Sequence, residues 1–394
     1  QAALEKLGSQ MTGYFAYRGG TALRIFKDLE TFPKPETGIV FPQKLAAGKN
    51  TKTVYAKDFG WNPDNATEAL QKALDSEAAT VIVDNMGSPW HISSVSPRSN
   101  QTVVFRKGVR ILNDADTRNN PSKNATLFVL NASQNLMFIG EGDVVIGKYK
   151  DREERFKTAK GESGSGFTMN DCKNITLRNL TISECTTDGI SMGGVRNPNT
   201  EIYLEDVILD SNARQALTIG NVNGLYMRRV TFSRTGGTPP SLGIDLENTY
   251  EVMAQANIYL FDCTFSGNHA GDLNFSNSSY HPVTLYAKRC TFEPNPQTQL
   301  RIMSRCGVYM NNGIAAPSKI ILDSCTFKSY SEGVPICFAT CSLFDVRFIN
   351  SKILDIGPRH ANRPALAPVR FSLDRDFSKQ IRDWKDDKFE GSIF

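Results

Sequence analysis

Apolar and polar positions follow one short pattern that recurs along the chain from residue 174 onwards. Each copy reads apolar-x-apolar, then a break of two or three residues, then apolar-x-apolar. Because strand side chains alternate between two faces, each copy predicts two short strands that meet at a bend. The copies are residues 174–182, 201–209, 224–232, 257–265, 282–292, 319–327 and, more loosely, 343–349.

The spacing of these copies indicates how they pack. Their first apolar residues are 27, 23, 33, 25 and 37 positions apart, although the strand pattern itself hardly changes. A unit of two short strands cannot bury its apolar side alone, so neighbouring copies must stack, with the insertions as loops on the outside. The pattern predicts an all-β fold, a single-stranded parallel β-helix. The residues that set the spacing are Ile175, Ile202, Leu225, Ile258, Val283 and Ile320.

A helix is expected at the start of this solenoid. Residues 65–68 read Asn-Ala-Thr-Glu, a capping box, and Ala69, Leu70, Ala73 and Leu74 then form an apolar helical stripe. Such a helix would cover the open strand edge of the first coil.

This opening resembles a known superfamily. Residues 57–60 read Lys-Asp-Phe-Gly, and the helix follows through residues 67–75. A turn of this kind before a capping helix is similar to the opening of pectin-lyase-like right-handed parallel β-helices. The resemblance covers roughly residues 54–350 and implies the right hand of the helix. It does not identify the reaction, because that superfamily holds hydrolases, lyases, epimerases and phage tail proteins.

The repeat divides the chain into three parts. Residues 1–53, with Pro33, Pro35 and Pro42, predict a loop-rich lead-in; residues 54–355 predict the β-helix, which is the catalytic domain; residues 356–394 predict a tail that packs on the last coils. Residues 147–165 form a charged, Gly- and Ser-rich excursion. It is either a solvated loop or a flap over a substrate groove.

Composition restricts the partners. The 45 basic and 41 acidic residues give a net charge of +4, which is too balanced to indicate nucleic acid. The sequence contains no run of 18 apolar residues, so it predicts no membrane-spanning helix. The chain starts at Gln1 without Met; a removed signal peptide and a trimmed chain both explain this, and we expect a secreted or periplasmic protein. A monomer and a side-by-side homo-oligomer both fit.

Three cysteines occupy equivalent places in successive copies. Cys263, Cys290 and Cys325 each stand directly before Thr-Phe. This predicts a stacked column of buried thiols, in which Cys acts as a small apolar residue, and disulfides are the alternative. No Cys or His spacing fits a zinc site.

A second type of strand lies between the copies and carries the candidate chemistry. It recurs at residues 188–192, 215–219, 242–247, 271–275, 307–310 and 333–336. If the large apolar residues of these strands face the core, the alternate residues face outward. The outward set is Ser191, Thr218, Asp245, Glu247, Asp272, Asn274, Tyr309 and Asn311.

Asp245, Glu247 and Asp272 are therefore expected on one small patch of the surface. Like charges raise one another's pKa, so one carboxyl can stay protonated as a general acid while another is the base. Cleavage of a glycosidic bond needs such a pair. Asp245 and Asp272 in register would suit a retaining enzyme, whereas Asp245–Glu247 or Glu247–Asp272 would suit an inverting one, which we favour.

Other polar residues are expected around this patch as substrate-binding groups. Arg214 could hold a carboxylate or sulfate with both arms of its guanidinium, or it could only neutralise the acids. The patch itself could instead be a solvated polar face, or bind calcium through its oxygens. The expected substrate-binding residues are Asp188, Arg214, His269, Asn274, His281, Arg305 and Tyr309.

Three functions follow from this pattern. The first is a glycoside hydrolase that cleaves a long, anionic (uronic or sulfated) polysaccharide with no cofactor unless calcium binds. The second is a polysaccharide lyase that uses Arg214 or a histidine as the base. The third is a carbohydrate-binding solenoid without catalysis.

Overall fold

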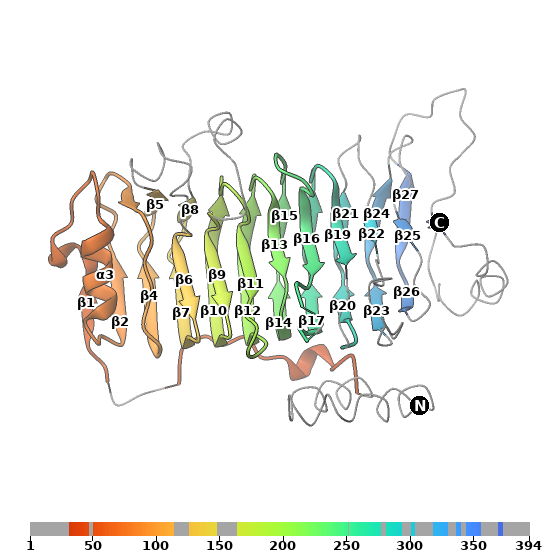
Figure 1. Ribbon diagram of the computed structural model, residues 1–394, viewed down its shortest axis with the longest axis horizontal. Coiled ribbons are helices and arrows are strands. Elements are labelled where there is room, and N and C mark those ends of the chain that lie inside the picture. Colours follow the sequence, from red (N-terminus) through yellow and green to blue (C-terminus); the bar gives the residue numbers. More distant parts are fainter. Residues whose placement is uncertain are drawn as a thin grey trace.

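The computed structural model describes residues 31–46, 50–113, 126–147, 164–250, 252–276, 281–293, 301–303, 318–329, 336–339, 344–355 and 369–372. Within this part of the chain, every strand pairing between named strands is parallel, and successive coils stack along one axis (Figure 1). The parallel β-helix predicted from the repeat is confirmed.

Most coils contribute two arms to one long sheet and one strand to a second sheet or, towards the C-terminal end, to a third. Sheet A contains the repeats recognised in the sequence, and sheet B contains the second type of strand. The strands of sheet A are β1 (Thr53–Tyr55), β2 (Thr80–Val83), β3 (Trp90–Ile92), β4 (Gln101–Phe105), β5 (Arg110–Asn113), β7 (Gln134–Gly140), β8 (Val145–Gly147), β10 (Lys173–Ser183), β12 (Thr200–Asp210), β14 (Val222–Arg228), β15 (Thr231–Ser233), β17 (Gln255–Phe261), β18 (Thr264–Ser266), β20 (Thr284–Lys288), β21 (Thr291–Glu293), β23 (Ser318–Asp323), β24 (Thr326–Ser329), β26 (Phe344–Ile349) and β27 (Lys352–Asp355).

Sheet B and a third sheet form the remaining side of the solenoid. Sheet B contains β6 (Phe128–Asn131), β9 (Phe167–Asn170), β11 (Ile190–Gly193), β13 (Gln215–Ile219), β16 (Leu242–Glu247) and β19 (Gly271–Ser276). Sheet C contains β22 (Arg301–Met303), β25 (Ile336–Ala339) and β28 (Val369–Ser372). A strand at residues 307–310 was expected, but these residues lie outside the described part. The described strand that pairs with β25 on this side is β22.

The bend inside each repeat from residue 174 to residue 327 lies at a residue with left-handed backbone, which is Asn or Asp in three repeats and Arg229, Arg289 or Ser324 in the others. Asn179, Asp206, Asp262 and Ser324 all have φ between 54° and 56°, in the left-handed region. Asn and Asp adopt this conformation at lower cost than other residues with a side chain, since their short polar side chains bond locally. The polar break between the two apolar runs therefore turns the chain between the two arms of sheet A.

Aromatic and sulfur columns hold the coils in register. Phe232, Phe265, Phe292 and Phe327 stack in the core with successive ring centroids 4.6, 4.7 and 4.8 Å apart. Cys263, Cys290 and Cys325 stand two residues before these rings and are buried free thiols, so the predicted column is confirmed. Their Sγ atoms lie near backbone carbonyls, as in the 3.5 Å contact from Cys325 to Ala287 O.

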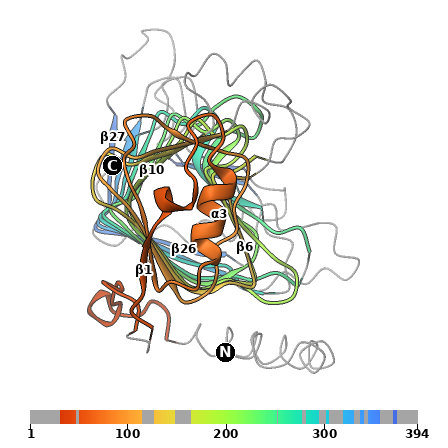
Figure 2. The ribbon, with the colours of Figure 1, turned by 90° about the vertical axis from the view of Figure 1, so that its left-hand side faces the viewer.

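Helix α3 (Thr67–Asp75) covers the first coil, as the sequence predicted (Figure 2). Its buried residues are Ala69, Leu70, Ala73 and Leu74, the predicted apolar stripe. The capping box is wrong in detail, because Ala66 is the N-cap residue and makes no side-chain cap. Asn65 Oδ1 instead accepts hydrogen bonds from the Thr67 amide at 3.0 Å and the Thr67 hydroxyl at 2.6 Å.

The N-terminal residues 32–43, which we call the strap, cross the outer face of sheet A (Figure 1). The strap includes the short helix η1 (Glu36–Gly38); a second short helix, η2 (Ala56–Phe59), follows β1. Lys319 Nζ donates to Phe32 O at 3.2 Å, and at the other end Arg178 donates to Pro42 O. The strap therefore spans coils from β23 back to β10.

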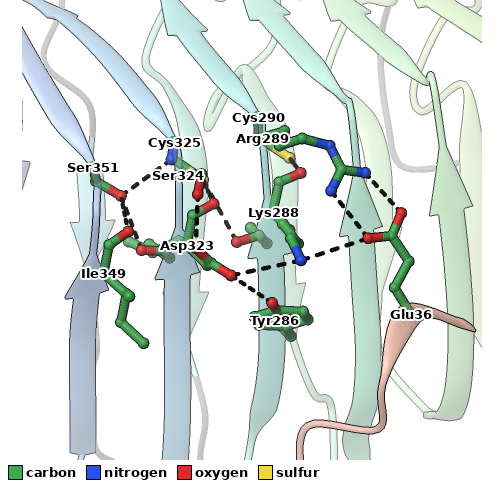
Figure 3. A network of polar contacts seen from close by, with 12 residues as sticks. Glu36, Tyr286, Lys288, Arg289, Cys290, Asp323, Ser324, Cys325, Ile349 and Ser351 are labelled. Atoms are coloured by element: carbon green, nitrogen blue, oxygen red, sulfur yellow. Dashed lines mark hydrogen bonds and ion pairs between the residues drawn. The ribbon is translucent and has the colours of Figure 1, made fainter.

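Aromatic contacts and ion pairs fix the strap. The Phe32 ring lies 5.5 Å from Tyr259, and Phe41 lies 5.8 Å from Tyr203. Figure 3 shows Glu36 facing Arg289 and Lys288, at 2.7 and 3.7 Å. The hydrogen bond from Arg289 lowers the pKa of Glu36.

Among the described residues, no helix is long and apolar enough to cross a membrane.

Candidate functional site

The outer face of sheet B brings several of the expected residues together. The strand register aligns Thr218 of β13 with Asp245 of β16, and Asp245 with Asn274 of β19. Glu247 follows two residues after Asp245 on the same strand and so projects from the same face. The core residues Leu217, Ile244 and Leu273 alternate with this row and are fully buried.

Asp245 is held from both sides by amide groups. Gln215 Nε2 donates to Asp245 Oδ2 and Asn274 Nδ2 donates to Asp245 Oδ1, both at 2.7 Å. Gln215 Oε1 accepts the Leu242 amide at 2.9 Å, which orients its NH₂ group towards the acid. The sequence predicted Asn274 in this place but gave Gln215 no role; its signal was only its position one coil before Asp245.

Burial dominates the protonation of Asp245. The residue is 1% exposed, and desolvation raises the pKa of its carboxyl to about 7 against the hydrogen bond from Asn274. The negative charges of Glu247 and Asp188 raise this pKa further, while Arg214 lowers it. At neutral pH, Asp245 can therefore hold a proton that an ordinary aspartate would have lost.

Arg214 links the other acids of the cluster. Its Nη1 lies 3.7 Å from Asp188 Oδ2, and its Nη2 lies 4.0 Å from Glu247 Oε2. Asp188 Oδ2 also accepts the Thr218 hydroxyl at 2.9 Å. We call Asp188, Arg214, Asp245 and Glu247 the carboxylate cluster.

The members of the cluster differ in access to solvent. The Glu247 side chain is 49% exposed, whereas the side chains of Arg214 and Asp188 are 17% and 5% exposed. The cluster thus combines a buried, proton-holding acid with an accessible carboxylate on one face of one strand.

The expected position of Asp272 is wrong. Asp245 aligns with Asn274, and the neighbouring register places Asp272 beside Gly243. A Cβ at Gly243 would meet the Phe265 ring at 3.0 Å and Asn268 Nδ2 at 3.1 Å, so this column points into the solenoid. Asp272 is 0% exposed and accepts from Asn268 Nδ2 at 2.9 Å. It stands at the start of β19, where the bend breaks the simple alternation of faces.

The two expected histidines, His269 and His281, differ in their exposure to solvent. His269 is exposed on the turn before β19, and its Cβ lies 3.2 Å from where a Cβ on Gly236 would be. His281 is buried before β20, and burial lowers the pKa of its imidazole to about 4. Arg305 and Tyr309 lie outside the described residues.

Within the part of the chain that the structure describes, no three His, Cys, Asp or Glu side chains group so as to hold a metal ion. Calcium binding stays an untested prediction.

Comparison with known sequences agrees with the fold. A family model described as "Right handed beta helix region" matches residues 163–357. The uncharacterized protein YorA, derived from the SPbeta prophage of Bacillus subtilis (strain 168), is 23% identical over 249 residues. That alignment covers 56% of this chain and 42% of YorA, so the chain spans less than half of that relative.

Solved structures share the same architecture at low identity. PfbA, a surface adhesin of Streptococcus pneumoniae, superimposes with a TM-score of 0.57 at 12% identity, covering 81% of each chain. The family GH82 iota-carrageenase from A. fortis superimposes with a TM-score of 0.54 at 13% identity, covering 87% of this chain and 99% of the enzyme. The chain therefore shares the right-handed parallel β-helix fold with these proteins, and the family model for that region matches residues 163–357.

Proposed function

We propose that the protein is a glycoside hydrolase that cleaves a long polysaccharide at the carboxylate cluster. One observation supports this most directly: Asp245, with a pKa of about 7, lies two residues from the exposed Glu247 on the same face of β16. Two carboxyl groups in different protonation states are what hydrolysis of a glycosidic bond needs.

In this proposal Asp245 is the general acid. Its proton passes to the glycosidic oxygen as the bond to the anomeric carbon breaks, and the sugar on the leaving side departs as an alcohol. Glu247 is the general base: it takes a proton from a water molecule, whose oxygen attacks the anomeric carbon from the opposite face. Arg214 orients Glu247, because it contacts both Glu247 and Asp188.

The arrangement favours inversion of the anomeric centre. Residues two apart on a strand are about 6.5–7 Å apart. The side chains of Asp245 and Glu247 both project from the same face of β16, so this backbone spacing is compatible with a carboxyl separation of about 6.5–9.5 Å, which leaves room for a water molecule between acid and base. The strand register does not support the pairing of Asp245 with Asp272, which would have suited retention, because Asp245 aligns with Asn274.

An anionic polysaccharide, uronic or sulfated, is the proposed substrate class. Arg214 could exchange its ion pair with Glu247 for a carboxylate or sulfate of the substrate. The fold that the chain shares with an iota-carrageenase is compatible with such a substrate.

Two other functions compete with this proposal. A lyase would need Arg214 or a histidine as the base, but Arg214 lies beside Asp188 and Glu247 as an ion-pair partner, and an arginine guanidinium stays charged in proteins and cannot accept a proton. A solely binding protein is favoured by the slight exposure of Asp245, and the adhesin PfbA has the same fold.

The test is incubation with a panel of uronic and sulfated polysaccharides while reducing ends and ultraviolet absorbance are followed together. The hydrolase predicts new reducing ends without absorbance from an unsaturated product. Asp245→Asn and Glu247→Gln should each lower the rate by at least roughly a hundredfold, because each removes one acid–base partner. Absorbance that rises with the reducing ends would contradict hydrolysis and support the lyase.

Asp272→Asn is the matched control, since it changes a neighbouring buried acid that faces inward. Its activity should stay near that of the unsubstituted protein. If Asp272→Asn abolished turnover while Asp245→Asn did not, the assignment of the acid would be wrong.

A further inference from the structure

The outer face of sheet A carries rows of threonine and serine side chains. These rows lie on the second arms of the coils, on the opposite side of the bend from the strap. The second arms of the coils read Thr-x-Ser or a close variant, and their middle residues are Ile182 in β10 and the stacked phenylalanines of the core from β15 onwards. Because side chains alternate, the flanking hydroxyl residues face outward. We call them the hydroxyl ladder: Thr181, Thr231, Thr264, Thr291 and Thr326 in one row, with Ser183, Ser233 and Ser266 in the next.

The rows are in register from coil to coil. Thr231 pairs with Thr264, Thr264 with Thr291, and Thr291 with Thr326. The stacked rings beneath fix the step, since their centroids lie 4.6 to 4.8 Å apart. From Thr181 to Thr326 the threonine row spans roughly 24 Å at about 4.8 Å per coil.

The threonine hydroxyls are available to a ligand. Thr231, Thr264, Thr291 and Thr326 are all partly exposed. Among the described residues, no hydrogen bond to another side chain or to the backbone uses these four hydroxyls, whereas Ser233 donates to Asp210 at 2.6 Å. Since β-branched side chains have few rotamers, the row presents hydroxyl and methyl groups in a fixed order at little entropic cost.

Charged residues beside the hydroxyl ladder form ion pairs, so the net charge of this surface is small. At one end Arg234 pairs with Asp210 at 2.5 Å, and at the other Lys328 pairs with Glu293 at 2.9 Å. Ile208, 42% exposed, stands between Thr181 and Thr231 in the same row and adds apolar surface. The ligand that matches such a surface is uncharged, elongated, rich in hydroxyl groups and partly apolar.

We propose that the hydroxyl ladder is a second polysaccharide-binding surface, separate from the carboxylate cluster, and that it holds a neutral polysaccharide chain along the solenoid axis. Sugar hydroxyls would exchange hydrogen bonds with the threonine row, and the C–H faces of the rings would pack on the threonine methyl groups and Ile208. A row at a regular step suits a polymer better than a single sugar, because several weak contacts act together.

The test is affinity electrophoresis of the full chain in native gels that contain galactomannan, xyloglucan, mixed-linkage β-glucan or dextran. At least one of these neutral polymers should retard the protein. The variant with Thr231→Val, Thr264→Val and Thr291→Val keeps side-chain shape and strand preference but removes three hydroxyls. Its association constant should be lower by roughly tenfold or more. Because no charges are used, about 0.5 M NaCl should leave retardation unchanged.

Two control variants show whether binding belongs to the hydroxyl ladder. Thr102→Val removes a hydroxyl from β4, outside the ladder, and should bind like the unsubstituted protein. Asp245→Asn should also retain binding, so a failed hydrolase assay would not affect this result. The proposal is overturned if no neutral polymer retards the protein, if the triple variant binds equally while its melting temperature is unchanged, or if salt abolishes the retardation. A triple variant that unfolds is replaced by Thr264→Glu, whose single charge in the row must weaken binding if the proposal holds.

Discussion

Asp272, at the start of β19, allows the energetic cost of a buried carboxylate to be measured without any substrate. The residue is fully buried, and its Oδ2 has no hydrogen-bond partner within the described residues. Desolvation raises the pKa of its carboxyl to about 7 against the hydrogen bond from Asn268, and Glu293 adds to the increase. Ionised Asp272 therefore destabilises the folded state.

The direction of the pH dependence follows from linkage. The folded state holds the Asp272 proton more tightly than the unfolded state, whose carboxyl has an ordinary pKa of 3.8. The free energy of unfolding should therefore fall as pH rises from about 4 to about 7 and then level off. At 1.36 kcal/mol per pH unit, this interval corresponds to about 4 kcal/mol. That figure is an upper limit, because water entering the corner would relax the cost.

Asp272→Asn mimics the protonated side chain at every pH. We expect the variant to match the unsubstituted protein near pH 4 and to be more stable by about 1–4 kcal/mol above pH 7. Denaturant titrations of both proteins between about pH 4 and 8.5 measure the difference directly. Asp245 has a raised pKa as well, so the comparison uses this difference and not the pH curve of either protein alone. A difference that stays constant over the pH range would refute the reasoning.

Three further changes test the core, the strap and the site. Phe265→Ala removes a ring stacked at 4.6 and 4.7 Å between its neighbours and should lower the free energy of unfolding by about 3–5 kcal/mol, measured by denaturant titration. Phe41→Ala removes the ring that packs on Tyr203 and lies 4.1 Å from the Arg228 guanidinium; hydrogen exchange of residues 32–43 should accelerate while the core of the solenoid stays protected. Asn274→Leu removes a hydrogen bond that lowers the pKa of Asp245, so the alkaline limb of the pH–activity profile should move to higher pH; an unmoved limb would mean that Asp245 is not the acid.

The N-terminal lead-in and the corner of β19 show where sequence reasoning stopped. Residues 32–43 carry prolines and no period, which predicted an extended segment but not the face it crosses. Its position depends on contacts with residues more than 200 positions away, such as Glu36 with Arg289. Asp272 was misplaced because strict alternation of faces was applied to a residue at a corner, where the backbone turns.

The sequence by itself determined the solenoid, its helical cap, the stacked cysteines and the position of Asp245 and Glu247 on one strand. These features repeat or depend on neighbours along the chain, and repeated units that cannot bury their apolar sides alone must stack on one another. The tertiary structure decided the register between coils, which pairs Asp245 with Asn274 and not Asp272. It also decided burial, and thereby which carboxyl holds a proton, since loss of water around a charge depends on atoms that lie far apart in the sequence.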